Sequence, residues 1–186
     1  METAHEIGFS YLGGSLEQIK IKVNQTEKEF KVLQSFEFNS DRKRMSILLR
    51  DGSDLKLYVK GADNIILDRL NKDVSHPFLD SVSLKLEQFS RGGYRTLVYA
   101  MRIVTESEYK TLREKLDDLA TAENREEKIG IFLFISISYL KKAQLANDFE
   151  KNLCLIGCTA VEDRLQDNVP KVIEDLLLSG IQRETL

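Results

Sequence analysis

Alternation of apolar and polar side chains over the first sixty residues is the feature that most constrains the fold of this chain. In the segment QIKIKV, for example, Ile19, Ile21 and Val23 fall on one face and polar side chains fall on the other. A period of two with one polar face is typical of strands in an antiparallel sheet. The predicted strands are residues 8–14, 18–23 and 29–38, followed by a hairpin over residues 45–61 that turns at residues 51–54.

Beyond residue 61 the apolar residues mostly recur at helical spacing. Predicted helices cover residues 62–70, 76–93 and 105–120, a strand covers residues 94–104, and a second charged helix runs from Asn124 to the segment LANDFEKN. Thr105 is followed three residues later by Glu108, which predicts a capping box at the start of a helix. The sequence therefore predicts an α+β fold, a mainly antiparallel β-sheet flanked by helices.

The composition fits one globular domain, or one domain with a fragment of a second. The chain has 186 residues, of which 42% are hydrophobic, and its formal net charge is −3. This even balance argues against the strongly basic face of a duplex nucleic-acid binder. Cys154 and Cys158 do not form a CxxC motif and His5 and His76 are isolated, so we expect reduced cysteines in a cytosolic protein and no metal site.

The longest apolar run is IGIFLFISISYL at residues 129–140. It is too short to cross a bilayer, which takes about 20 residues, and is interpreted as a buried strand or helix. The first residues of the chain have neither the basic stretch nor the apolar run of a secretory signal, so we expect no such signal here.

Three short elements place aromatic, cationic and glycine residues at strand ends. They are FEFNSDRKRMS, which contains Phe38, KGAD at residues 60–63, and GGYRTL at residues 92–97, which contains Arg95. If the sheet brings them together, a ring is available to stack on a purine and cations are available for a phosphate chain. Gly61 would let the backbone approach such a ligand closely.

Each element taken alone also has a simpler interpretation. Phe38 by itself is more often a core residue. The three consecutive cations Arg42, Lys43 and Arg44 are compatible with a solvated sheet edge that discourages aggregation. Lys60 before a glycine is compatible with an ordinary turn. Charge and periodicity alone therefore leave an anion site and a structural role both open.

In combination and in this order, the elements resemble the nucleotide-binding domain of P-type ATPases over nearly the whole chain. FEFNSDRKRMS and VKGADNIILDRL are similar to the versions found in the phospholipid-transporting branch, the flippases. LIGCTAVEDRLQDNVPKVI resembles the segment in which the family's chain returns to the phosphorylation domain. The resemblance implies a nucleotide-binding domain at residues 1–153 and a short C-terminal stub of the phosphorylation domain at residues 154–186.

The resemblance also implies which residues bind ATP. Phe38 is expected to stack on adenine, Lys60 to lie in the adenine pocket near the phosphates, and Arg95 to contact the phosphate chain. On this interpretation the cations lie beside an aromatic residue because the ligand is ATP. The other residues expected at the nucleotide are Lys43 as a second cation, Glu37 at the adenine edge, and Gly61, Thr96 and Leu97 lining the pocket.

The family's phosphorylated aspartate lies in a DKTGT motif, which this sequence lacks, as it lacks the TGD motif. The resemblance therefore implies a chain that binds ATP without turning it over, with no catalytic or metal-ligating residues of its own. Mg²⁺ is expected to be held mainly by the nucleotide and the phosphorylation domain. In the parent ATPase, at the cytosolic face of a membrane, ATP hydrolysis would be coupled to phospholipid translocation.

The expected partners are ATP, the phosphorylation, actuator and transmembrane domains of the parent, and an accessory subunit. No nucleic acid is expected to bind, and the isolated domain is expected to be monomeric. Two alternatives remain: a non-catalytic interaction module with the same fold and little nucleotide affinity, and the nucleotide domain of a cation-transporting P-type ATPase. The run at residues 129–140 departs from the family and is interpreted either as a helix extension or as an annotation error.

Overall fold

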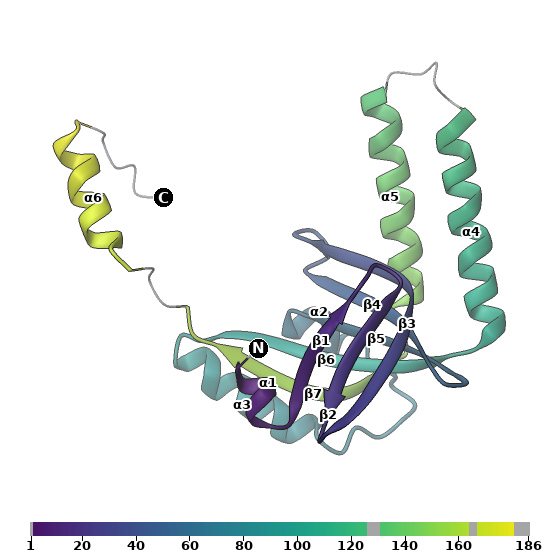
Figure 1. Ribbon diagram of the computed structural model, residues 1–186, viewed down its shortest axis with the longest axis horizontal. Helices are drawn as coiled ribbons and strands as arrows, with labels where there is room; N and C mark the ends of the chain where they lie inside the picture. Colours follow the sequence, from purple (N-terminus) through teal and green to yellow (C-terminus); the bar gives the residue numbers. More distant parts are fainter. Residues whose placement is uncertain (1, 126–130, 164–166, 181–186) are drawn as a thin grey trace.

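The computed structural model describes residues 2–125, 131–163 and 167–180, and for residues 2–3, 122–125 and 131–138 it describes the backbone alone. Within these residues, seven strands form one sheet in the order in which they occur in the chain (Figure 1). Every neighbouring pair is antiparallel. The strands are β1 (Phe9–Gly14), β2 (Gln18–Val23), β3 (Thr26–Asn39), β4 (Arg44–Asp51), β5 (Asp54–Gly61), β6 (Arg95–Val104) and β7 (Cys154–Val161).

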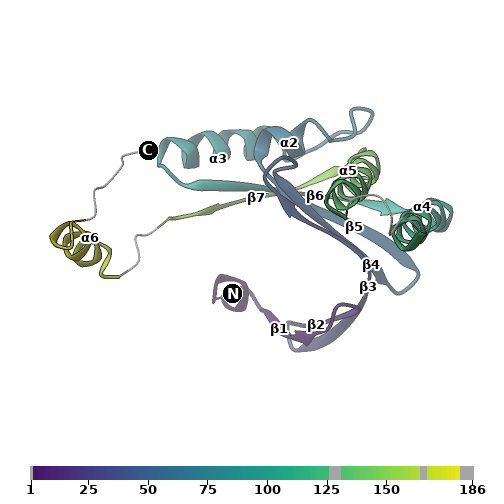
Figure 2. The ribbon, with the colours of Figure 1, turned by 90° about the horizontal axis from the view of Figure 1, so that it is seen from above.

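The helices lie mainly on one face of this sheet. They are α1 (Glu2–Glu6), α2 (Asp63–Leu67), α3 (Leu79–Arg91), α4 (Glu106–Arg125), α5 (Ile131–Phe149) and α6 (Val169–Leu178). Seen from above, α2, α3 and α5 lie on one side of the central strands, and the sheet curls so that β1 and β2 turn away on the other side (Figure 2). The predicted α+β architecture, a mainly antiparallel sheet with helices, is confirmed.

The core forms where alternate residues of the central strands meet the helices. Leu48, Leu57 and Val98, from three adjacent strands, are all fully buried, and Ile66 of α2 and Ala146 of α5 are buried with them. Because side chains alternate along a strand, the residues between these positions face the opposite side of the sheet. One face of β4–β6 is therefore covered by helices and the other face is open.

The helices predicted at residues 62–70 and 76–93 are shorter in the structure, and the largest difference from the prediction lies at the end of α4. α4 continues without a break through Arg125, so the prediction that a second charged helix begins at Asn124 is wrong. The segment TAENR contains neither glycine nor proline, and nothing in it stops the helix. The predicted capping box is confirmed, since the Thr105 N–H donates to Glu108 Oε2 at 2.8 Å and the Glu108 N–H donates to Thr105 Oγ1 at 3.2 Å.

Residues 131–140 of the apolar run belong to α5, in agreement with the helical interpretation, while residues 129 and 130 lie outside the described residues. Among the described helices, none combines the length and the apolar character needed to cross a membrane.

The expected division of the chain after residue 153 falls at the start of β7. This strand is paired with β6 from Cys154, opposite Met101, to Val161, opposite Arg95. β7 is therefore the last strand of the same sheet.

Candidate functional site

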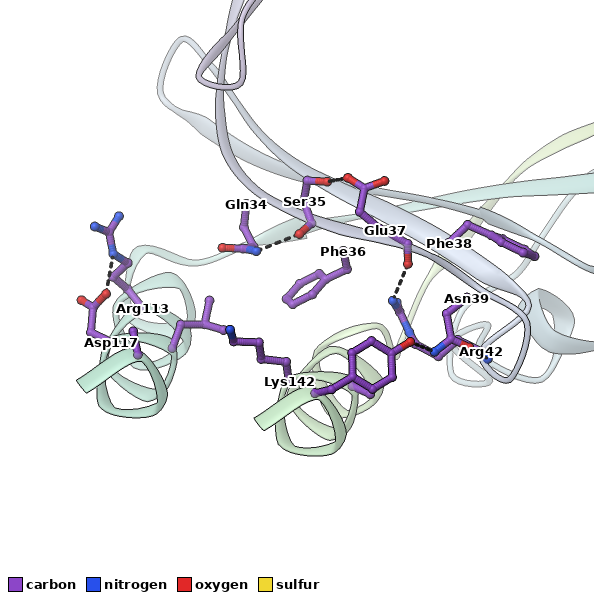
Figure 3. A pocket seen from close by; sticks show the side chains of 14 residues that line it. Gln34, Ser35, Phe36, Glu37, Phe38, Asn39, Arg42, Arg113, Asp117 and Lys142 are labelled. Atoms are coloured by element: carbon purple, nitrogen blue, oxygen red, sulfur yellow. Dashed lines mark hydrogen bonds and ion pairs between the residues drawn. The ribbon is translucent and has the colours of Figure 1, made fainter. Parts of the chain in front are cut away.

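A β-bulge near the end of β3 gives two neighbouring aromatic residues different environments. The register against β4 shifts between Phe36 and Asn39, which leaves Glu37 and Phe38 together opposite the single residue Met45. Strict alternation would have placed both phenylalanines on one face. Instead Phe36 is buried and points toward the helices, whereas Phe38 is 60% exposed and points away from them (Figure 3).

A row of side chains crosses the open face of the sheet at this level. Met45, Lys60 and Tyr99 are successive cross-strand neighbours on β4, β5 and β6. Their chain neighbours Val59 and Ala100 are buried in the core, so the row itself faces the open side. With strands about 4.8 Å apart, the row from β3 to β6 is roughly 14 Å long. The row thus begins with the ring of Phe38 on β3 and ends with Lys60 on β5 and Tyr99 on β6.

A shallow cavity of about 260 Å³ lies on this face. Its walls include Met45, Tyr58, Lys60, Tyr99 and Ile156. It is smaller than the roughly 300–1,000 Å³ of typical small-molecule pockets. A cavity of this kind, with two aromatic rings and one ammonium group, suits a flat ring such as a nucleobase, with the rest of the ligand outside.

The residues expected around the nucleotide do not all face this cavity. Leu97 and Arg95 share the open face of β6 with Tyr99, because they alternate with the buried residue Val98. By the same alternation Thr96 lies on the helix-covered face.

Gly61 faces the neighbouring strand and is buried. A Cβ added to Gly61 would lie 2.5 Å from Arg44 Cβ and 2.6 Å from the Lys43 carbonyl oxygen. The absence of a side chain at Gly61 is therefore required by the close approach of β4.

The three consecutive cations of the β3–β4 connection divide into two groups. Arg42 and Arg44 form ion pairs with the buried carboxylate of Glu150, which directly follows α5. Lys43 between them is exposed and adopts a left-handed backbone conformation with a φ of 51°. Lys43 is the only one of the three that was expected at the nucleotide, and the two arginines beside it share an internal acid instead.

Glu150 and Tyr99 are the two important residues that the sequence did not reveal. Glu150 lies 106 residues from Arg44, and no local pattern links them. Tyr99 stands on a predicted strand, but its place beside Lys60 depends on the register of two strands. Near Glu150, burial and then the positive charge of Arg44 lower the pKa of Arg69, so cations are crowded around this acid.

A second, larger cavity of about 500 Å³ lies between β3 and the helices α4 and α5. Figure 3 shows it on the side of Phe36, with Ser35 and Glu37 on the other side of the strand. Arg42 reaches across its rim and donates from Nη1 to the Glu37 carbonyl oxygen at 2.9 Å. The end of β3 lies between the two cavities: Phe38 lines the larger one, whereas Lys60 lines the smaller one on the open face.

Comparison with known families defines the class of this protein. A model of the family described as P-type ATPase, cytoplasmic domain N, matches residues 2–168, so the chain belongs to that family. Its similar relatives include phospholipid-transporting ATPases. The chain is 38% identical to the phospholipid-transporting ATPase DRS2 of Saccharomyces cerevisiae over 182 residues, and 42% identical to DNF1 of Chaetomium thermophilum over 183 residues.

These matches cover 95% and 97% of the chain, but only 12% and 11% of the two relatives. The chain therefore spans about one eighth of the length of the curated relatives it matches. The resemblance to P-type ATPases read from the motifs is confirmed.

Proposed function

We propose that the open face of β3–β6 binds ATP and presents it to an aspartate elsewhere in a phospholipid-transporting P-type ATPase. The observation that carries this proposal is the row of Phe38, Lys60 and Tyr99 across one end of the sheet. Lys60 and Tyr99 line one cavity together with Met45, and the exposed ring of Phe38 lies on the next strand, opposite Met45. Membership of the family supports an adenine nucleotide as the ligand.

Each residue has a physical role in this proposal. Phe38 stacks on the adenine ring, and Glu37 lies beside it as an acceptor for the exocyclic amino group. Lys60 lies between base and phosphates, where its ammonium group forms charge-assisted hydrogen bonds. Lys43 and Arg95 attract the phosphate chain from its two sides, and Leu97 supplies apolar contact.

Mg²⁺ enters this proposal with the nucleotide. Within the described residues, no group of three or more His, Cys, Asp or Glu side chains is placed to hold a metal ion. The ion, coordinated by the phosphates, supplies charge neutralisation during phosphoryl transfer. What this chain contributes is the position of the nucleotide, and the nucleophile belongs to another part of the parent.

We also propose the wider setting of the domain. The parent would couple aspartyl-phosphate formation to phospholipid translocation, with this domain on the cytosolic side of the membrane. The phosphorylation, actuator and transmembrane domains would be its partners within the chain, with an accessory subunit beside them. We propose that the domain in isolation is a monomer, and that its sheet, including β7, ends at Val161, before the return to the phosphorylation domain.

The experiment that tests nucleotide binding is an NMR or calorimetric titration of this chain with ATP, ADP and GTP. A small open site predicts a dissociation constant from high micromolar to millimolar, on the order of −4 to −6 kcal/mol. Lys60→Ala should weaken binding strongly, and Lys22→Ala, an exposed lysine in β2, should not. No binding to the folded wild-type chain at millimolar ATP would contradict the proposal and favour a non-catalytic interaction module.

A further inference from the structure

Glu150 is a fully buried acid whose carboxylate accepts hydrogen bonds from three side chains. All three belong to β4 or to the connection that leads into it. Its side chain has no exposed surface. Oε1 accepts from Arg42 Nη2 and from Ser46 Oγ, both at 2.5 Å, and Oε2 accepts from Arg44 Nε at 2.6 Å. Its carboxylate thus joins the end of α5 to the connection between β3 and β4.

The two arginines also bind the backbone of that connection. Arg42 donates from Nη1 to the Glu37 carbonyl oxygen at 2.9 Å, and Arg44 donates from Nη1 to the Arg42 carbonyl oxygen at 3.0 Å. Each guanidinium group therefore uses one arm on Glu150 and another arm on the chain that carries Glu37, Phe38 and Lys43. A rigid, forked cation is needed for such a double contact, and arginine supplies it.

Lys43, between the two arginines, is held in an uncommon conformation. Its φ of 51° is in the left-handed region, which a lysine seldom adopts. Its N–H donates to the Asn39 carbonyl oxygen at 2.7 Å, and its carbonyl oxygen accepts from the Ala62 N–H at 3.0 Å. A conformation of this kind persists where the surrounding structure fixes it, and the side chain of Lys43 is thereby turned outward.

We infer that Glu150 is the positioning residue of the nucleotide site, holding Arg42 and Arg44 so that Phe38 and Lys43 are presented on the open face. This inference rests on the proposed function of that face. Glu150 itself touches no ligand in this account. It acts through the two arginines, from the helix-covered side of the sheet.

Charge explains why a carboxylate is needed here. Two guanidinium groups brought together in a poorly solvated site repel each other unless an acid lies between them. When the acid becomes an amide, the arginines separate, and the backbone to which they are bound moves with them. The substitution should therefore displace Lys43 and loosen the bulge. These local changes should weaken ligand binding more than an equal loss of stability elsewhere in the domain.

The test compares Glu150→Gln with a control of equal severity far from the loop. Leu55→Ala truncates a buried leucine at the opposite end of β5 from Gly61, about 20 Å along the strand. Both chains are titrated with ATP at a temperature at which circular dichroism shows them folded. We expect the ATP dissociation constant to rise about tenfold for Glu150→Gln and less than twofold for Leu55→Ala.

A second variant covers the case in which Glu150→Gln does not fold. Arg42→Lys keeps the charge but cannot span Glu150 and the Glu37 carbonyl oxygen, so it should weaken ATP binding about three- to tenfold. Combining it with Lys43→Ala should give less than the product of the two single effects, because both act through the same lysine. Fully multiplicative effects, or an unchanged dissociation constant in both Glu150→Gln and Arg42→Lys, would overturn the inference.

Backbone amide dynamics separate this inference from the proposed function. Without any nucleotide, NMR relaxation should show increased motion at residues 37–44 in Arg42→Lys or Glu150→Gln, and not in Leu55→Ala. If wild type binds no ATP, the proposed function fails while this loop measurement still stands. If ATP binds but the loop in the variants is as rigid as in wild type, Glu150 is merely structural and the inference fails alone.

Discussion

Arg95 and Asp163 form an ion pair at the edge of the sheet, with Arg95 Nη2 donating to Asp163 Oδ2 at 2.6 Å. Arg95 begins β6, opposite Val161 at the end of β7, and Asp163 follows two residues later. Both side chains are largely exposed. A phosphate chain that reaches Arg95 therefore has to compete with a carboxylate of the same chain.

Asp163→Asn should therefore strengthen ATP binding. An exposed ion pair contributes about 0.2–1 kcal/mol, so the expected decrease in the dissociation constant is about 1.4- to fivefold. Asp167→Asn is the control, because it removes the same charge four residues further along the chain, at a position for which no contact with Arg95 is found among the described residues. Calorimetry at low ionic strength measures the ATP dissociation constants of both variants. Equal changes in the two would show that net charge, and not the ion pair with Arg95, determines the affinity.

Phe38→Ala should weaken nucleotide binding with little effect on folding. The ring is already 60% exposed, so few core contacts are lost, while loss of base stacking should cost about 1–3 kcal/mol of binding free energy. Phe78→Ala is the matched control, since Phe78 is 59% exposed and precedes α3. A large drop in the melting temperature of Phe38→Ala with unchanged ATP affinity would contradict the stacking role.

Gly61→Ala should destabilise the domain, because the new Cβ would collide with Arg44 Cβ and with the Lys43 carbonyl oxygen. Overpacking against backbone typically costs about 1–3 kcal/mol. Gly157→Ala on β7 meets nothing within 4 Å and should leave stability nearly unchanged. Urea unfolding curves of the two variants provide the comparison. Equal midpoints would contradict the prediction, because they would show that β4 and β5 move apart to admit the methyl group without loss of stability.

The Glu108 cap should make stability depend on pH. Burial acts to raise the pKa of Glu108, but hydrogen bonds from the Thr105 N–H and hydroxyl, together with Arg102, outweigh it and hold the pKa below its usual value. A carboxyl with a lowered pKa in the folded state stabilises the fold above its unfolded pKa, and this stabilisation disappears as the pH falls through the folded pKa.

Glu108→Gln should therefore lower stability by about 1 kcal/mol at pH 7, in line with the loss of a cap, and by much less near pH 3. Glu114→Gln, an exposed acid on the same helix, should show no such dependence. Thermal unfolding at both pH values measures the difference, and a pH-independent loss in Glu108→Gln would rule out ionisation as its cause.

Much of the fold could be predicted because its signals are local. Alternation in residues 18–23 and in the hairpin over residues 45–61 indicated the strands, and Thr105 with Glu108 indicated where α4 begins. The end of α4 was missed because helix termini without glycine or proline leave little trace in a sequence. The length of the strand from Thr26 to Asn39 was also missed, since its first residues are polar.

The site was only partly predictable because it depends on register. A sequence shows that Phe36 and Phe38 are two apart, but a bulge, which needs the partner strand to define it, decides that one is buried and the other exposed. Likewise the row from Lys60 to Tyr99 follows from pairing of strands separated by two helices. Motif resemblance pointed to Lys60 without giving its neighbours.

The sequential order of the strands has a consequence for synthesis. Each strand up to β6 can pair with its predecessor as soon as it leaves the ribosome, so most of the sheet can assemble progressively. Arg42, however, waits for Glu150, which is 108 residues further along the chain. At 5–20 residues per second that interval is roughly 5–20 s. The newly made domain therefore spends this time with the two arginines of this loop unpaired from Glu150, and the face proposed to bind nucleotide is completed last.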